Sequence, residues 1–214
     1  MASLRITEIF LSLQGEANTV GLPTVFVRLT GCPLRCQYCD SEYAFSGGKN
    51  HAVDAIVEQV RDYGVSHVTV TGGEPLAQPA VHELLPKLCD LGLHVSLETS
   101  GALAVDRVDS RVVKVVDFKT PGSGEVARNL WDNVGWLSAQ DQVKFVICNR
   151  QDYDWTKLKC DEHGLSALVA DVLLSPSFGE ITPTELGDWI VEDRLPVRMQ
   201  VQLHKLLWGD EPGR

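Results

Sequence analysis

"TVFVRLTGCPLRCQYCD", residues 24–40, joins a β-branched apolar run to three closely spaced cysteines. The run predicts a β-strand, because branched and aromatic residues favour extended backbone. Cys32, Cys36 and Cys39 follow it in a loop, and they supply one thiolate fewer than a closed tetrahedral zinc site needs. The sequence therefore places an incomplete set of metal ligands directly after a strand.

Helical and strand-like segments alternate beyond this loop. Residues 51–64 place Val53, Ile56, Val57 and Val60 on one helical face, ahead of Gly64. The strand-like segment "SHVTVTGGEP" comes next. Further helices are expected near 79–92, 124–138, 151–163 and 182–194, the last opened by a capping box with Pro at its first helical position. Further strands are expected in "LHVSLETSG", "RVVKVVDF", "QVKFVIC", "ADVLLSPS" and "PVRMQVQL".

Strands that alternate with helices in this way predict βαβ units and a parallel sheet. We expect six to seven mostly parallel strands, fewer than the eight of a closed barrel. The expected fold class is therefore α/β, an open, partial βα barrel. No linker or repeat interrupts residues 1–214, which predicts a single domain. The segment "ITEIFLSLQGE" predicts a strand or hairpin at the edge of the sheet.

Five polar or Gly-rich segments follow the expected strands: "GCPLRCQYCD", "TGGEP", "ETSG", "DFKTPG" and "SPS". The carboxyl ends of parallel strands meet at one edge of a sheet, where active sites collect. These five loops are therefore expected to line one pocket.

Composition narrows the class of protein. The 214 residues are 44% hydrophobic and 22% charged, as in ordinary globular proteins, and contain no apolar run long enough to cross a membrane. The formal charge of −10 comes without a basic stripe, so no nucleic-acid partner is expected. No secretory signal opens the chain, which predicts a cytoplasmic protein. In that compartment clustered thiols bind metal more often than they form disulfides.

Three interpretations of the cysteine loop remain: a zinc site, unligated thiols, and a [4Fe–4S] cluster. Zinc would need a fourth ligand, and His51 lies twelve residues beyond Cys39 at the start of an expected helix. A cluster held by three cysteines leaves one iron open to an outside ligand, as catalytic sites do. Cys89, Cys148 and Cys160 are scattered and are expected to be small buried or incidental residues.

The Cx3Cx2C loop and "TGGEP", residues 71–75, together resemble the radical S-adenosylmethionine (SAM) superfamily. The resemblance implies that SAM chelates the open iron and that the reduced cluster releases a 5′-deoxyadenosyl radical. It also implies that Tyr38 lies near the adenine and that the glycines let backbone approach the SAM ammonium group.

Nearly the whole chain, from "EIFLSLQGE" to "QVQLHKLLWG", is similar to the 7-carboxy-7-deazaguanine synthase family of queuosine biosynthesis. The implied reaction contracts the ring of 6-carboxy-5,6,7,8-tetrahydropterin to 7-carboxy-7-deazaguanine with loss of ammonia. SAM is then a regenerated cofactor and Mg²⁺ assists. A homodimer and a flavodoxin- or ferredoxin-type reductant are also implied. The chain reads "QGEAN" where the family has "QGEG".

The resemblance also assigns site residues. Cys32, Cys36 and Cys39 would hold the cluster, and Ser41, at a position that is usually Thr, would bind Mg²⁺. The implied SAM contacts are Tyr38, Cys39, Asp40, Gly73, Asp117, Phe118, Lys119, Ser175, Pro176, Ser177 and Phe178. The implied substrate contacts are Leu13, Gln14, Gly15, Glu16, Arg28, Thr71, Glu98, Gln200, His204 and, at the chain end, Arg214.

Arg28 stands out among these residues, because an arginine in an apolar strand needs an anion, and a substrate carboxylate suits its planar fork. A salt bridge to a core Glu is the structural alternative. For the whole chain two other functions stay open: an activase that makes a glycyl radical on a partner enzyme, and a non-catalytic Fe–S or zinc module.

Overall fold

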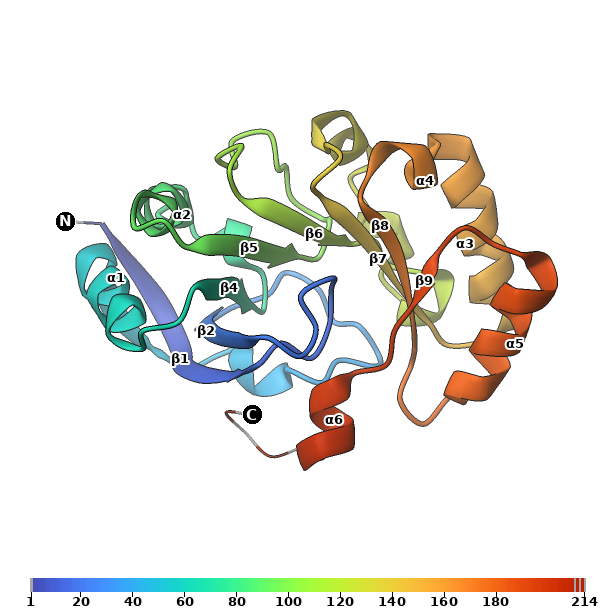
Figure 1. The fold of residues 1–214 in the computed structure, drawn as a ribbon, viewed down its shortest axis with the longest axis horizontal. Helices are drawn as coiled ribbons and strands as arrows, with labels where there is room; N and C mark the ends of the chain where they lie inside the picture. Colours follow the sequence, from blue (N-terminus) through green and yellow to red (C-terminus); the bar gives the residue numbers. More distant parts are fainter. Residues whose placement is uncertain (1, 210, 212, 214) are drawn as a thin grey trace.

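The computed structural model describes residues 2–209, 211 and 213, and within them nine strands form one curved sheet (Figure 1). The spatial order is β3-β1-β2-β4-β5-β6-β7-β8-β9. The strands are β1 Ser3–Leu13, β2 Pro23–Leu29, β3 Lys49–Ala52, β4 His67–Gly72, β5 His94–Thr99, β6 Val113–Asp117, β7 Gln142–Ile147, β8 Asp171–Pro176 and β9 Arg198–Met199.

Seven strands, β2 and β4 to β9, pair in parallel with their neighbours. In the described part of the chain the two end strands, β3 and β9, do not pair with each other, so the barrel is open. The expected fold class, an open α/β barrel, is confirmed. β1 and β3 add an antiparallel extension. The strand expected in residues 6–16 is confirmed as part of β1, and β3 covers only the first part of β1, from Ser3 to Ile6, so the rest stays at the edge within the described residues.

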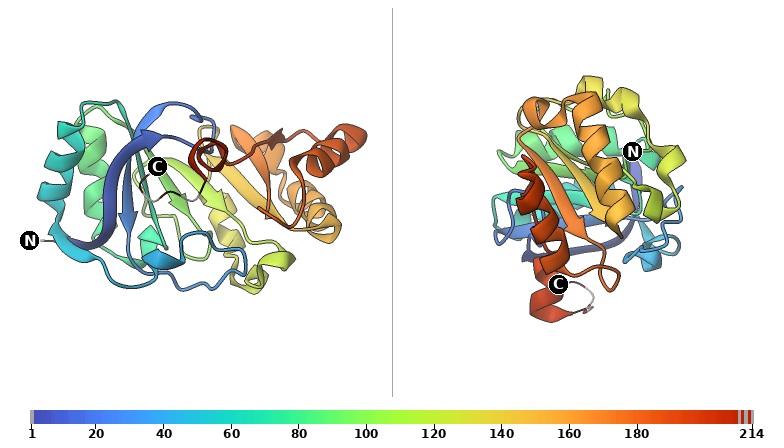
Figure 2. Two further views of the ribbon diagram at one scale, coloured as in Figure 1. Left: turned by 90° about the horizontal axis from the view of Figure 1, so that it is seen from below. Right: turned by 90° about the vertical axis from the view of Figure 1, so that its right-hand side faces the viewer.

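The α-helices are α1 Val53–Asp62, α2 Val81–Asp90, α3 Arg150–His163, α4 Leu165–Leu168, α5 Pro183–Asp193 and α6 Leu203–Trp208. The 3-10 helices are η1 Glu42–Ala44, η2 Pro75–Ala77, η3 Pro121–Ser123, η4 Val126–Arg128 and η5 Trp131–Trp136. Helices α1 to α5 lie on the outer side of the arc (Figure 1). In the view from below, α6 lies beside the loop that joins β1 to β2 (Figure 2).

Two local expectations have opposite outcomes. The capping box of α5 is confirmed, since Thr182 and Glu185 exchange side-chain and backbone hydrogen bonds. The helix expected over 124–138 was wrong, because only the 3-10 turns η4 and η5 form there. The Asn133 side chain bonds to backbone groups of residues 101, 103 and 105, and such side-chain bonds compete with helical backbone pairing.

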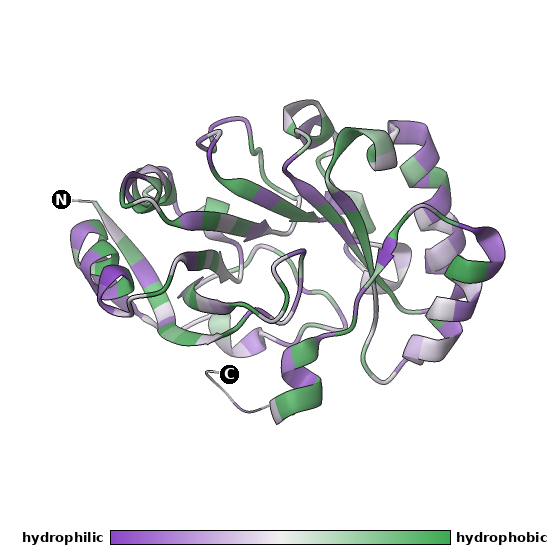
Figure 3. Cartoon of the chain, in the orientation of Figure 1, coloured by the Kyte–Doolittle hydropathy of each residue, from purple (hydrophilic) through white to green (hydrophobic). Residues whose placement is uncertain are grey.

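The two faces of the sheet differ in polarity, and Figure 3 shows hydrophobic and hydrophilic residues in alternating bands along β4 to β6. Outward-facing residues such as Val68, Val70 and Leu97 pack against α1 and α2, and Val143 and Phe145 belong to a second apolar cluster beneath α3 to α5. Inward-facing positions carry Arg, Thr, Glu, Asp, Lys and Ser. Burial of the outer face therefore stabilises the arc, while the inner face is left for a ligand site.

Candidate active site

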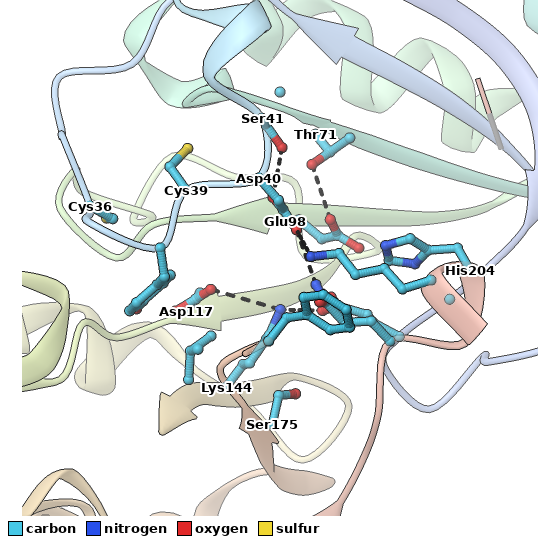
Figure 4. Close-up of a pocket in the computed structure, with 18 of the residues that line it drawn as sticks. Cys36, Cys39, Asp40, Ser41, Thr71, Glu98, Asp117, Lys144, Ser175 and His204 are labelled. Carbon is cyan, nitrogen blue, oxygen red and sulfur yellow. Dashed lines mark hydrogen bonds and ion pairs between the residues drawn. The ribbon is translucent and has the colours of Figure 1, made fainter. Parts of the chain in front are cut away.

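A cavity of about 640 Å³ occupies the concave side of the sheet at the carboxyl ends of the strands. Six of the seven parallel strands, all except β9, direct at least one polar side chain toward it, and Figure 4 shows those labelled converging from separate strands. In sheet order these residues are Arg28 (β2), Thr71 (β4), Glu98 (β5), Asp117 (β6), Lys144 (β7) and Ser175 (β8). The five loops expected to share one pocket therefore meet.

The cysteine loop forms one wall of the cavity. Cys32, Cys36 and Cys39 all line it and are partly exposed. Two short-range hydrogen bonds shape the loop: the Cys39 N–H donates to the Cys36 carbonyl at 3.1 Å, and the Leu34 N–H donates to the side-chain sulfur of Cys32 at 3.4 Å. Gly31, with φ of 100°, adopts a conformation that other residues rarely reach.

The donor set fits a multi-iron cluster better than a single ion. Among residues 2–209, 211 and 213, no three His, Cys, Asp or Glu side chains gather tightly enough to share one ion. A cubane needs no such convergence, because each of its thiolates binds a different iron. Burial raises the pKa of Cys36 to about 11, so binding of iron to this thiol would release a proton.

The "TGGEP" loop locks against the cysteine loop. A Cβ on Gly73 would lie 2.3 Å from the Gly31 carbonyl oxygen and 2.8 Å from the Cys32 Cβ, so only glycine fits. Glu74 is fully buried and accepts hydrogen bonds from Thr99, the last residue of β5, and from Ser100, which follows it. The sequence pattern does not reveal this anchor, which ties two rim loops together.

Three hydroxyls beside the loop lack partners. Tyr38 Oη, Ser175 Oγ and Ser177 Oγ are buried, and in the described part of the chain each has no hydrogen-bond partner. All three residues line the cavity. Buried hydroxyls are normally satisfied, so these atoms mark places for a polar ligand. They lie where the resemblance expects SAM, whose ribose and adenine carry suitable groups.

The β1–β2 loop and α6 form the opposite wall. Gln14 donates to Thr69 at 3.1 Å and to Glu98 at 3.3 Å, while its carbonyl oxygen accepts from the Glu16 N–H. His204 packs on Gly15 so closely that a Cβ there would lie 2.1 Å from its Nδ1. Burial lowers the pKa of His204, which favours the neutral imidazole.

A chain of charges crosses the floor of the cavity. Glu16 and Lys144 form an ion pair, and Lys144 lies 3.9 Å from Asp117, which pairs with Lys119 at 3.1 Å (Figure 4). Burial opposes ionisation of Glu16, but Lys144 and Gln202 hold the pKa of this carboxyl below its usual value. The pKa of Glu98 is raised, by burial and by the nearby Glu16 charge.

Arg28 lies under the rim on β2 with its side chain 17% exposed. Its Nε donates to Glu8 at 2.7 Å, and the guanidinium lies over the rings of Phe10 and Tyr43. The structural alternative named for Arg28, a salt bridge to Glu, is therefore present. Arg28 still lines the cavity, so the pair positions the guanidinium beside the ligand space.

The described structure brings most of the expected site residues to the cavity and leaves two of them, Phe118 and Gln200, apart. Phe118 is fully buried and stacks on Trp131 with ring centroids 4.4 Å apart. Gln200 accepts from the Ala17 N–H at 2.9 Å and does not line the cavity. Arg214 lies outside the described residues. Contacts of these three with a ligand stay predictions.

Several cavity residues were not anticipated. Lys144, Gln202, Lys205, Tyr43, Phe10 and Phe26 line the cavity as well. A signal existed for Lys144, since the alternation in "QVKFVI" puts this lysine on the face opposite Val143 and Phe145. None existed for Gln202 and Lys205, which reach the site only because α6 folds back.

Within the described residues, no helix is both long and apolar enough to span a membrane.

Comparison with known proteins is consistent with this geometry. The radical SAM superfamily model matches residues 26–114. The 7-carboxy-7-deazaguanine synthase of Koribacter versatilis is 41% identical, over 97% of this chain and 98% of its own length. That of Chlorobaculum tepidum is 42% identical, over 98% and 96%.

The fold has a counterpart among solved structures. The crystal structure of QueE from Escherichia coli superposes with a TM-score of 0.72 at 22% identity, over 94% of this chain and 95% of that one. Identities of 41% and 42% along nearly the entire chain, together with the three-cysteine loop on an open barrel, place this chain in the 7-carboxy-7-deazaguanine synthase family of the radical SAM superfamily.

Proposed function

We propose that this protein is a radical SAM lyase that converts 6-carboxy-5,6,7,8-tetrahydropterin to 7-carboxy-7-deazaguanine with release of ammonia, a step toward queuosine. The observation that carries the proposal is the meeting of the cysteine loop and the β1–β2 loop across one cavity. When bound, the [4Fe–4S] cluster and SAM supply the 5′-deoxyadenosyl radical that removes a substrate hydrogen. The reaction also uses Mg²⁺.

The residues of the chain position and isolate the substrate. The guanidinium of Arg28 would bind the substrate carboxylate, and Glu16 would accept from the N–H groups of the pyrimidine edge. A carbon radical attacks almost any nearby C–H bond, so orientation alone selects the carbon that bears the carboxylate. Helix α6 helps to exclude water, because its first residue bonds to the Gly15 carbonyl.

Further residues are assigned to the cofactors. Cys32, Cys36 and Cys39 would hold the cluster, and the unpartnered hydroxyls of Ser175 and Ser177 support a SAM site beside them. Ser41 would bind Mg²⁺; its hydroxyl lines the cavity and donates to Asp40 at 3.0 Å. Magnesium keeps most of its water or substrate oxygens, so one protein hydroxyl is sufficient.

The test is product formation under strict anaerobiosis. Reconstituted protein with SAM, dithionite, Mg²⁺ and the carboxypterin should form 7-carboxy-7-deazaguanine without consuming SAM. Cys39→Ala should lose iron and all turnover, while Cys160→Ala, a buried thiol in α3, should keep both. Absence of the deazaguanine in the wild-type reaction would refute the proposal. An iron-dependent glycyl radical on a partner enzyme would instead indicate the activase.

The remaining assignments depend on the resemblance. We propose a single domain, since one sheet runs from β3 to β9, and a cytoplasmic homodimer reduced by a flavodoxin or ferredoxin. Light scattering of the purified protein tests the dimer, and replacement of dithionite by each reduced carrier tests the reductant.

A further inference from the structure

Six carboxylate residues of the described chain line the cavity, and four of them, Glu16, Asp40, Asp117 and Glu98, differ clearly in their counter-charges. Three belong to ion pairs: Glu16 with Lys144, Asp40 with Lys205 at 3.3 Å, and Asp117 with Lys119 at 3.1 Å. Glu98, in the described part of the chain, has no ion pair and accepts hydrogen bonds from Thr71 at 3.0 Å and Gln14 at 3.3 Å. The pairing therefore separates a fixed carboxylate, Glu16, from its unpaired neighbour Glu98.

Lys144 is the least ordinary member of this set. It lies in the interior of β7, its side chain is 12% exposed, and its strand neighbour on β6 is Asp117. Its ammonium contacts Glu16 from the β1–β2 loop and lies 3.9 Å from Asp117. A single buried charge thus joins the loop expected to bind substrate to the strand expected to bind SAM.

We propose that Lys144 is a positioning residue, whose ammonium keeps Glu16 ionised and oriented to accept hydrogen bonds from the N–H groups of the pterin. This inference rests on the proposed function, which brings a 2-amino-4-oxopyrimidine edge into the cavity. An ionised carboxylate only accepts hydrogen bonds, so it matches a row of donors, whereas a protonated one would meet a donor with a donor.

The surroundings of Glu16 explain why it needs this lysine. Burial and the negative charge of Asp40 both favour the protonated form of Glu16, and the charge of Glu16 in turn raises the pKa of Glu98. Lys144 and the amide of Gln202, which donates to Glu16 at 2.7 Å, oppose burial and Asp40 and keep the pKa of Glu16 lowered. His204 also lies near Glu16, but burial lowers its own pKa.

The sheet contains a matched control. Lys114 and Asp141 form a second buried pair at 3.0 Å, with side chains 6% and 0% exposed. Lys114 is near the start of β6, on the opposite face from Asp117, and neither it nor Asp141 lines the cavity. Loss of either ammonium leaves a buried carboxylate without its counter-charge, but only one of these carboxylates lines the cavity.

The experiment measures binding apart from turnover. Anaerobic holoenzyme with cluster and SAM, but without reductant, is titrated with 6-carboxy-5,6,7,8-tetrahydropterin by calorimetry between about pH 6 and pH 9, a span that covers a carboxyl pKa raised by burial. Lys144→Met should weaken binding at least tenfold at about pH 7, and the loss should shrink as pH rises and Glu16 ionises again. Lys144→Arg should restore most of the affinity, and Lys114→Met should lower the melting temperature without changing Kd.

Alternative outcomes separate the two claims. A folded Lys144→Met enzyme that binds the pterin with wild-type Kd and wild-type pH profile overturns the inference. If that variant does not fold, Glu16→Gln/Lys144→Met removes both charges, and wild-type affinity in this double variant overturns it equally. Wild-type holoenzyme that binds no pterin refutes the proposed function instead.

Discussion

The convex and concave faces of this sheet belong to the same strands but carry opposite chemistry. Along β7, Val143 and Phe145 point outward into the apolar cluster under α3, whereas Lys144 points inward to the cavity. The outer residues gain from leaving water. The inner charges lose favourable hydration, and attraction within ion pairs and to a ligand offsets part of that free-energy cost. One face therefore holds the arc together, and the other does so only in part, because its groups are arranged for binding.

Substitution of Phe145 on the convex face should have the largest effect on stability. Phe145 is fully buried against Phe118 and Trp155. Phe145→Ala should lower the free energy of unfolding by about 3–5 kcal/mol, because it leaves a cavity. Denaturant titration measures this, and KM of the folded fraction should stay near the wild-type value. A large rise in KM with unchanged stability would show that the two faces are not separable.

Substitution of Arg28 on the concave face should act in the opposite sense. Arg28→Lys keeps a cation for Glu8 but loses the bidentate fork. KM for the carboxypterin should rise about tenfold, with a melting temperature close to wild type. Steady-state kinetics and calorimetry on the same preparation measure both quantities. An unchanged KM would mean that Arg28 serves only its pair with Glu8.

Glu98 tests the difference between the two faces directly, because this buried carboxylate on the concave face, unpaired within the described residues, should lower the stability of the protein. Burial and Glu16 raise the pKa of Glu98 in the folded state, so the ionised form is disfavoured there. Its stability contribution is full below the unfolded pKa near 4.5 and is lost as pH rises through the folded pKa. Glu98→Gln should therefore raise stability at neutral pH by about 1 kcal/mol, and the gain should vanish in acid. Equal gains at both pH values would contradict this account.

Ser41→Thr should have the smallest effect. The hydroxyl remains, and the β-methyl group restricts χ1, so the oxygen is better oriented. The Mg²⁺ concentration for half-maximal activity should fall about twofold to fivefold, with no change in iron content, as expected when only rotamer freedom is lost. Activity independent of Mg²⁺ in both proteins would remove Ser41 from the magnesium site.

Local pattern was sufficient for much of the fold. The β-branched runs and the capping box at Thr182 predicted six to seven mostly parallel strands and α5, because neighbouring residues set those preferences. Pattern failed where distant groups intervened. Asn133 bonds to backbone near residue 103 and prevents a helix, and β3 forms only because β1 offers it an edge. Neither interaction has a trace in the adjoining sequence.

The sequence by itself determined the three-cysteine loop, the glycines that press against it, and the alternation that gives each strand a polar side. These features are local, since they depend on spacing and on backbone conformations that only some residues adopt. Tertiary structure alone decided which lysine pairs with which carboxylate. It also decided which residues of "QVQLHK" line the cavity, namely Gln202, His204 and Lys205. Two of these pairings, Glu16 with Lys144 and Asp40 with Lys205, join residues more than 100 positions apart, because electrostatic energy depends on distance in space and on burial, which the folded chain sets.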